Sequence, residues 1–279
     1  MKKIIAAIDG LKLSESTVNY AVHLAKQANT HLVGIFLEDF TYHSYKIYDL
    51  VGNEGVSEKK MHRLEEKDKA TRAQAVESFE ETCQRAGLNY SVHHDRSIAI
   101  RELLHESVYA DLLVIDSKET LTHYEEETPT RFIRDLLVNV ECPVLLVPST
   151  YKPIDRIILL YDGSPSAVYA IKMFSYMLPS LKHVQAEVLS VKDTNENMHV
   201  PDNSLMKEFM KRHFPNAIYT VLQGNPETEI LKHLKNKEQN MLVVLGAYHR
   251  GMVSRWFKAS MADTLMKAVH APLFIAHNK

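Results

Sequence analysis

The sequence feature that most constrains the fold is an internal repeat. Three apolar segments of the first half return in the second half in the same order, two of them with the same polar or proline residues at their ends. The matching pairs are 4–10 with 157–163, 111–116 with 241–246, and 142–147 with 271–276. Because three landmarks keep their order, the repeat indicates a duplication, and we expect two copies of one domain.

The length supports this division. A chain of 279 residues corresponds to two domains at about 100 to 200 residues each. The polar link from Ser149 to Pro153 separates a closing apolar run from an opening one, so the predicted domains are 1–149 and 153–279. The first is longer because of an insertion at about residues 40–80.

Each copy alternates short apolar runs with segments of helical periodicity. Continuous runs such as Ile4–Ile8 are typical of strands buried on both faces of a parallel sheet. The sequence predicts a helix from Ser14, a charged helix from about Ser57 to Arg85 that ends at Gly87, and a short strand at Asn89–His93. The fold class is therefore α/β, with a doubly wound parallel, Rossmann-like sheet in each copy.

Composition excludes several classes of function. A formal charge of -2 and a pI near 6.7 give no broad basic surface, so we expect no nucleic-acid partner. Since the sequence lacks an apolar run of about 18 residues, we also expect no membrane partner. Cys83 and Cys142 are too isolated for a disulfide framework, which favours a cytoplasmic location.

The candidate ligand site is the long loop from Leu245 to Ser260. It follows the apolar run Met241–Val244 and precedes a segment of helical periodicity, with Ser260 as the expected N-cap. A loop at the carboxyl end of a parallel sheet is where open α/β folds bind ligands. The backbone N–H groups of the helix N-terminus are then available to an anion.

At this point the residues resemble a known family, the universal stress proteins, over essentially the whole chain. The motifs are Asp162-Gly163-Ser164 after an opening strand, Ser190–Asp193 at the end of a second strand, the glycine-bearing loop, and the closing run Ala271–Ile275. The resemblance implies two tandem domains of the adenine nucleotide alpha hydrolase-like type. It also implies that strands 142–148 and 271–277 pair as an intramolecular pseudo-dimer.

The resemblance further implies a nucleotide site in the second copy. Asp162 and Val191 would serve the adenosine end, and the loop with its serine would serve the phosphates. The family's loop has three glycines, whereas this chain has His249 and Ala259 in the second and third positions. The candidate cofactor-binding residues are Asp162, Gly163, Ser164, Val191, Gly246, His249, Ala259 and Ser260.

A Cβ at the second and third positions intrudes on space where backbone approaches phosphate. We therefore expect weak binding of an adenine nucleotide, AMP or ATP, with adenosine or AMP penalised less than ATP. Arg250, Arg255 and Lys258 offer cations in partial compensation. The alternative is a basic loop over a vestigial pocket.

The first copy is expected to bind no ATP. Asp116 replaces the first glycine of the loop, and the acidic run Glu125–Glu127 precedes a helix that opens at Thr128–Thr130. Carboxylates there are favourable with the helix dipole but put negative charge where a phosphate would bind. Asp9 and Leu37 still match the adenosine side.

No catalytic motif accompanies these residues, so we expect a non-catalytic stress-response regulatory protein, not an enzyme. His93-His94-Asp95 is no metal site, because neighbours on a strand point to opposite faces. Two alternatives stay open: an ATP-binding protein with slow hydrolysis, and a scaffold with both pockets closed. The sequence names no protein partner, and a homodimer stays open as well.

Overall fold

The computed structural model describes residues 1–39, 42–45, 51–52, 55–56, 58–193, 198–235, 240–246 and 259–277. The first half contains β1 (Lys3–Asp9), α1 (Glu15–Ala28), β2 (His31–Asp39), β3 (Val51–Gly52), β4 (Gly55–Val56), α2 (Glu58–Ala86), β5 (Tyr90–Ser97), α3 (Ala99–Ser107), β6 (Leu112–Asp116), α4 (Arg131–Asn139) and β7 (Val144–Val147). The second half contains β8 (Arg156–Leu160), α5 (Pro165–Met177), the 3-10 helix η2 (Pro179–His183), β9 (Gln185–Lys192), α6 (Asn203–His213), β10 (Ile218–Gln223), α7 (Pro226–Lys235), β11 (Met241–Gly246), α8 (Ala259–Ala268) and β12 (Leu273–Ala276).

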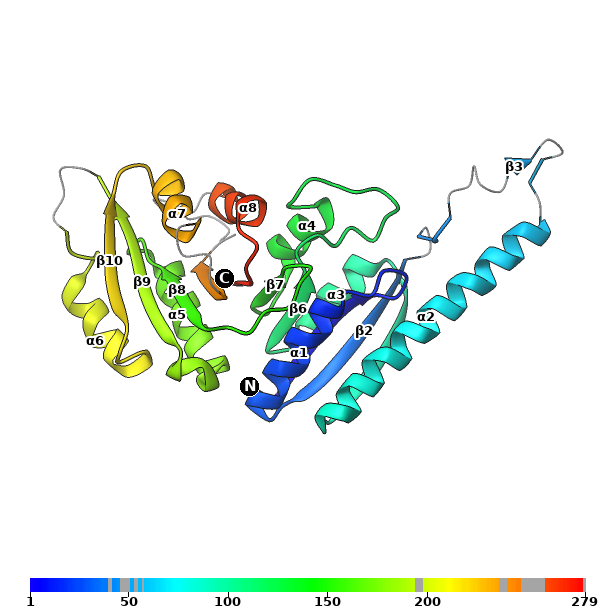
Figure 1. The fold of residues 1–279 in the computed structure, drawn as a ribbon, viewed down its shortest axis with the longest axis horizontal. Coiled ribbons are helices and arrows are strands. Elements are labelled where there is room, and N and C mark those ends of the chain that lie inside the picture. The colour runs from blue at the N-terminus through cyan, green and yellow to red at the C-terminus, as the bar shows by residue number, and fades with distance from the viewer. Residues whose placement is uncertain are drawn as a thin grey trace.

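Within these residues, ten strands form one continuous sheet in the order β10-β9-β8-β11-β12-β7-β6-β1-β2-β5. Read from either end to the centre, the two halves have the same strand order, and neighbours within each half are parallel. The halves lie side by side along the sheet (Figure 1). The predicted duplication into two doubly wound α/β units is confirmed.

The halves join through one antiparallel strand pair at the centre of the sheet. In β7 and β12, Leu146 lies opposite Leu273, and Leu145 lies opposite Phe274. These are the strands that the resemblance paired, so the expected intramolecular pseudo-dimer is present. The predicted domain boundary falls between the end of β7 at Val147 and the start of β8 at Arg156.

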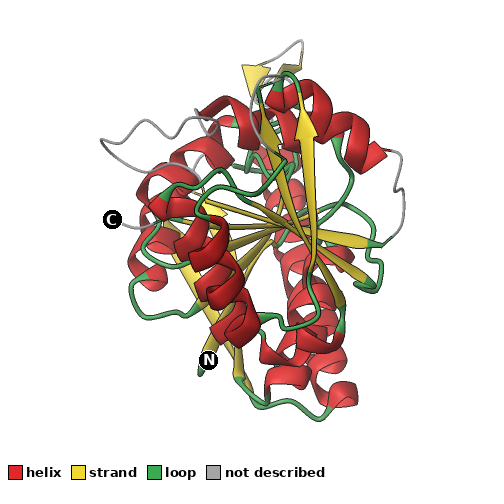
Figure 2. Ribbon diagram, turned by 90° about the vertical axis from the view of Figure 1, so that its left-hand side faces the viewer, coloured by secondary structure: helices red, strands yellow, loops and turns green. Residues whose placement is uncertain are grey.

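Helices cover both faces of the twisted sheet (Figure 2). Successive strand residues alternate between two buried apolar clusters, because side chains of a strand point to opposite faces. One cluster holds the buried residues of α1, α2, α5 and α6, and the other holds those of α3, α4, α7 and α8. Each cluster spans both halves, so the sheet has two cores that continue across its centre.

One predicted strand is longer in the structure, and the predicted charged helix is present with nearly the expected bounds. The strand expected at Asn89–His93 is β5, which runs on to Ser97 and pairs in parallel with β2 along its length. The polar sequence after His93 hides this extension, because pairing with β2 overrides the loss of apolar pattern. The charged helix is α2, which has 29 residues against 11 for its counterpart α6; its expected start at Ser57 lies outside the described residues.

The helix starts follow the sequence signals. Ser14 precedes α1, and its side chain accepts the Thr17 N–H. Thr130 precedes α4, where its side chain accepts the Ile133 N–H. Both residues provide the hydroxyl cap that satisfies an otherwise unpaired N–H of the first turn.

The central seam gives a stability prediction. Phe274 of β12 is fully buried, and its ring lies 5.1 Å from that of Phe174 in α5. Phe274→Ala should lower the free energy of unfolding by about 3–5 kcal/mol through lost contacts and a cavity. Urea denaturation followed by circular dichroism measures it. Val138→Ala, on the exposed side of α4, is the control, and a loss at Phe274 no larger than at Val138 would contradict the prediction.

Candidate functional site

The candidate site of the second half lies where β8, β9 and β11 end. Asp162 follows β8, Val191 is next to the last residue of β9, and Gly246 is the last residue of β11. In an open α/β sheet, ligands bind beyond the carboxyl ends of the strands. The structure therefore brings three of the sequence-predicted residues to one edge of the sheet.

The turn after β8 links Asp162 to the start of α5. Asp162 is 6% exposed, and its Oδ1 accepts the Ser164 N–H at 2.9 Å. Ser164 in turn caps α5, because its Oγ accepts the Ala167 N–H at 3.2 Å. Gly163 between them has φ +82, and a Cβ there would lie 2.8 Å from Pro201, so the turn requires glycine.

The end of β11 lies so close to the first turn of α5 that position 246 requires glycine. A Cβ at this position would overlap the carbonyl oxygen of Ser166 in the first turn of α5. The Ser166 Oγ is buried and has no hydrogen-bond partner among the described residues. Sequence reasoning missed Ser166, since nothing in the sequence signals that β11 ends against this turn.

Val191 presents only its backbone to this edge. Its side chain is fully buried in the core. The Leu189 carbonyl accepts the Tyr161 N–H at 2.9 Å, so the backbone N–H and C=O of Leu189 point toward β8. The direction of these groups alternates from one strand residue to the next, so the N–H and C=O of Val191, two residues later, also point to this side. On this side lies the turn at Asp162.

The loop that was expected to hold phosphates lies outside the described residues, and so does His249. Helix α8 begins at Ala259, so Ser260 is already helical. The prediction of Ser260 as N-cap is wrong by at least one residue, because apolar periodicity locates a helix better than it locates its first turn. Ser260 still belongs to the first turn.

In the first half, the side chain of Tyr42 lies against Asp9, the residue that corresponds to Asp162. Asp9 is 1% exposed, and its Oδ1 accepts the Leu11 N–H at 2.8 Å, in the same kind of turn as Asp162. Its other oxygen accepts the hydroxyl of Tyr42 at 2.9 Å. Arg72 of α2 donates to the Tyr42 carbonyl at 3.1 Å. Tyr42 is 3% exposed, so its ring fills space beside Asp9.

Carboxylates occupy the remaining positions of the first-half site. Asp116, which stands where the second half has Gly246, accepts the Ser14 hydroxyl at 2.9 Å. Glu126 accepts the Arg131 N–H at 2.7 Å, at the N-terminus of α4. The acidic run therefore binds the helix end that was considered for phosphate, as a carboxylate favours a helix N-terminus.

Glu119 adds a fourth carboxyl to the first-half site, after Asp9, Asp116 and Glu126. Burial raises the pKa of Glu119 to about 7, and the nearby charge of Asp9 acts in the same direction. Burial also raises the pKa of Asp9, although the hydrogen bonds from Leu11 and Tyr42 oppose the shift. A site in which neighbouring carboxylates raise the pKa of Glu119 is unfavourable for a polyphosphate.

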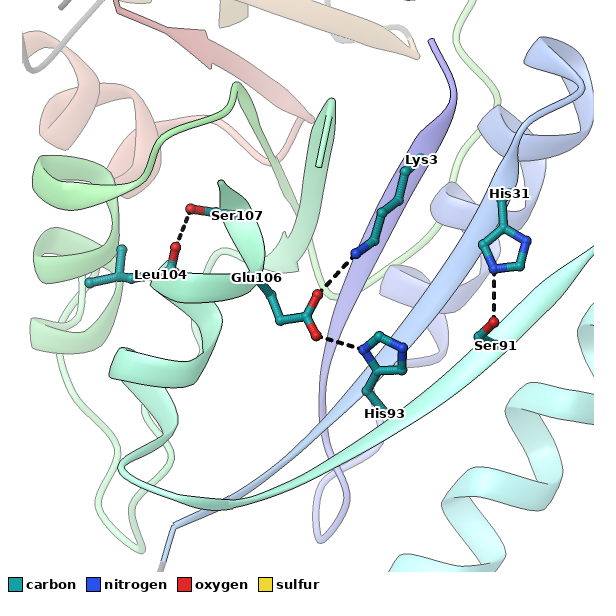
Figure 3. Close-up of polar contacts among 7 residues, drawn as sticks. All are labelled: Lys3, His31, Ser91, His93, Leu104, Glu106 and Ser107. Atoms are coloured by element: carbon teal, nitrogen blue, oxygen red, sulfur yellow. Dashed lines mark hydrogen bonds and ion pairs between the residues drawn. The ribbon is translucent and has the colours of Figure 1, made fainter. Parts of the chain in front are cut away.

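The two neighbouring histidines of β5 have different partners, as expected for residues on opposite faces of a strand. His93 Nδ1 lies 2.6 Å from Glu106 of α3, which also accepts from Lys3 at 2.9 Å (Figure 3). The ring of His94 instead stacks on Phe36, at 5.9 Å and 28°. Burial alone would raise the pKa of Glu106, but its bonds with Lys3 and His93 hold that pKa below the ordinary value.

The described residues place no group of three or more His, Cys, Asp or Glu where it could hold a metal ion. In the same part of the chain, we find no helix long and apolar enough to cross a bilayer.

The fold and the strand-end site define a class of protein: two doubly wound α/β units joined in one sheet, each with a turn at an aspartate beyond its first strand. The structure of a universal stress protein from Archaeoglobus fulgidus is similar to this chain, with a TM-score of 0.70 and 14% identity over 99% of this chain and 98% of that one. A functionally unknown protein from Pseudomonas aeruginosa matches with a TM-score of 0.59 and 12% identity over 99% and 92% of the two chains. No family model and no curated protein matches the sequence. The chain therefore has the universal stress protein fold over its whole length, as the resemblance implied.

The raised pKa of Glu119 predicts a pH dependence of stability. When the pKa of a carboxyl is higher in the folded than in the unfolded state, the free energy of unfolding falls as the pH rises between the two pKa values. For Glu119, this range runs from about 4.5 to about 7. Glu119→Gln keeps the oxygen that accepts the N–H groups of Thr120 and Leu121. The variant should therefore exceed the parent in unfolding free energy at pH 8 by about 1–3 kcal/mol, and match it near pH 4.5.

Urea denaturation at both pH values measures the difference. The exposed neighbour Glu125 supplies the matched variant Glu125→Gln, which should follow the parent protein at each pH. A Glu119→Gln variant that gains no stability between pH 4.5 and pH 8 relative to the parent would show that the carboxyl is not held above its ordinary pKa.

Proposed function

We propose that this chain is a non-catalytic, cytoplasmic regulatory protein of the universal stress protein type, with domains 1–149 and 153–279. The second domain binds adenosine or AMP, and the first binds no nucleotide. The observation that carries the proposal is the contact of Tyr42 with Asp9 in the first half, where the buried tyrosine donates its hydroxyl to the carboxylate at 2.9 Å.

The adenosine end of the second site is supported by three groups. The Asp162 carboxylate lies at the edge of the sheet, and the backbone of Val191 points toward it. The Ser166 hydroxyl is buried without a partner among the described residues, and such a hydroxyl is costly unless a ligand, water or another group pairs with it. Carboxylate, peptide and hydroxyl groups together match the donors and acceptors of a nucleoside.

The phosphate end is supported less well by the sequence. His249 and Ala259 replace two glycines whose missing side chains would let backbone N–H groups approach phosphate oxygens. The α8 N-terminus can still attract one phosphate. We therefore rank adenosine and AMP above ATP.

The two cysteines support the cytoplasmic part of the proposal. Cys83 and Cys142 are both buried and form no disulfide, as is common for proteins of a reducing compartment.

Calorimetric titration with adenosine, AMP and ATP tests the proposal. The parent protein should bind one AMP per chain and bind ATP more weakly. Asp162→Asn keeps the oxygen that accepts the Ser164 N–H but removes the charge, so it should weaken AMP binding about tenfold or more, since a hydrogen bond to a charged group contributes about 1.5–3 kcal/mol.

Asp9→Asn is the matched control, because it makes the same change in the same turn of the first half. It should leave AMP affinity unchanged. Two AMP per chain, equal losses in both variants, or tighter binding of ATP than of AMP would contradict the proposal. Phosphate release from ATP above background would favour slow hydrolysis, and no binding of any of the three compounds would favour the scaffold.

A further inference from the structure

A cavity lies at the opposite edge of the second half, where its strands begin. Its volume is about 480 Å³, within the range of about 300–1,000 Å³ that is typical of small-molecule sites. It is bounded by the start of β11, the segment between α8 and β12, the end of α7, the link between the halves, and Tyr20 of α1. The cavity shares no residue with the candidate nucleotide site.

Apolar residues form part of the wall of this cavity, beside polar ones. Leu234, Met241 and Val269 are buried, and Pro148, Pro153 and Pro272 complete the lining from the link and the start of β12. Proline rings and branched side chains offer a ligand contact area without donors or acceptors. The body of a matching ligand is therefore apolar.

Among the described residues, the charged groups that line the cavity are basic: Lys152, Lys235 and His270. The carboxylate of Asp155 lies close by, where it accepts from the side chain of the lining residue Asn240 at 2.8 Å. The helices α7 and α8 end at the cavity, and each C-terminus contributes about half a negative charge. The two lysines each present a full positive charge to the cavity itself.

Tyr20 places a buried hydroxyl against the same cavity. Its side chain is 1% exposed, and its oxygen accepts the Lys152 N–H at 3.1 Å. Within the described part of the chain, the Tyr20 hydroxyl donates to no acceptor. A buried donor of this kind is usually satisfied by a ligand, by water or by another protein group.

From these four observations, we propose that the cavity binds a small organic anion with an apolar body, of the class of aromatic carboxylates. The carboxylate is held by Lys152, Lys235 and the Tyr20 hydroxyl, and the apolar body packs on Met241 and Val269. Since Tyr20 and Pro148 belong to the first half, and Met241 and Val269 to the second, the ligand contacts both halves.

Nuclear magnetic resonance of methionine methyl groups tests the site directly. Met241 lies in the wall, whereas Met206 and Met210 lie in the core cluster on the other face of the sheet. Titration with phenylacetate should shift the Met241 methyl signal saturably and leave the signals of Met206 and Met210 in place. Met241→Leu assigns the signal.

Matched lysine variants distinguish binding in this cavity from a general attraction of the anion to positive charge on the protein. Lys152→Gln/Lys235→Gln should weaken phenylacetate binding about tenfold or more, for a loss of at least one ion pair. Lys172→Gln/Lys182→Gln removes the same charge from α5 and η2, away from the cavity, and should leave the affinity unchanged. Unchanged positions of the distant methionine signals show that each variant is folded.

Two further probes define the ligand class. Phenylacetamide, which has the same body without the charge, and inorganic phosphate, which has charge without the body, should each bind at least tenfold more weakly than phenylacetate. The proposal is overturned if phenylacetate gives no saturable shift at Met241, if either probe binds equally well, or if the two double variants behave alike.

Discussion

The pairing of β7 with β12 is the interaction on which the rest of the structure depends. Three residue pairs, including Leu145 with Phe274, connect two five-stranded parallel units into one sheet. Because the pairing is antiparallel, it relates the halves by a two-fold rotation and lets both apolar clusters continue across the junction. Burial on both faces stabilises this seam without any loop or cofactor, since the central strands expose almost no surface.

The same framework has different side chains at the corresponding edges of the two halves. In both the turn at Asp9 and the turn at Asp162, the carboxylate accepts the N–H of the residue two positions later, so both halves keep the same turn. What differs is the groups beside the turn: Tyr42 and Glu119 lie near Asp9, and Pro201 lies against Gly163. The two halves therefore keep the turn and surround it with side chains of different volume and charge.

Much of the fold could be predicted from the sequence because its signals are local. Apolar runs located the strands, and hydroxyl residues located the starts of α1 and α4. The end of β5 could not be found in this way, because its polar residues become a strand only through pairing with β2. Tyr42 was missed for the same reason, since it lies 33 residues from Asp9 along the chain, and only the folded structure brings the two together.

The covalent connection between the halves has a consequence for how such a molecule can change. In an assembly of two identical subunits, a tyrosine that blocks one binding edge would block the other as well, because a single gene specifies both. Fusion of the copies removes this coupling. In a tandem chain, one half can specialise while the other half serves only to complete the sheet. Each molecule then always contains one copy of each of the two unequal halves.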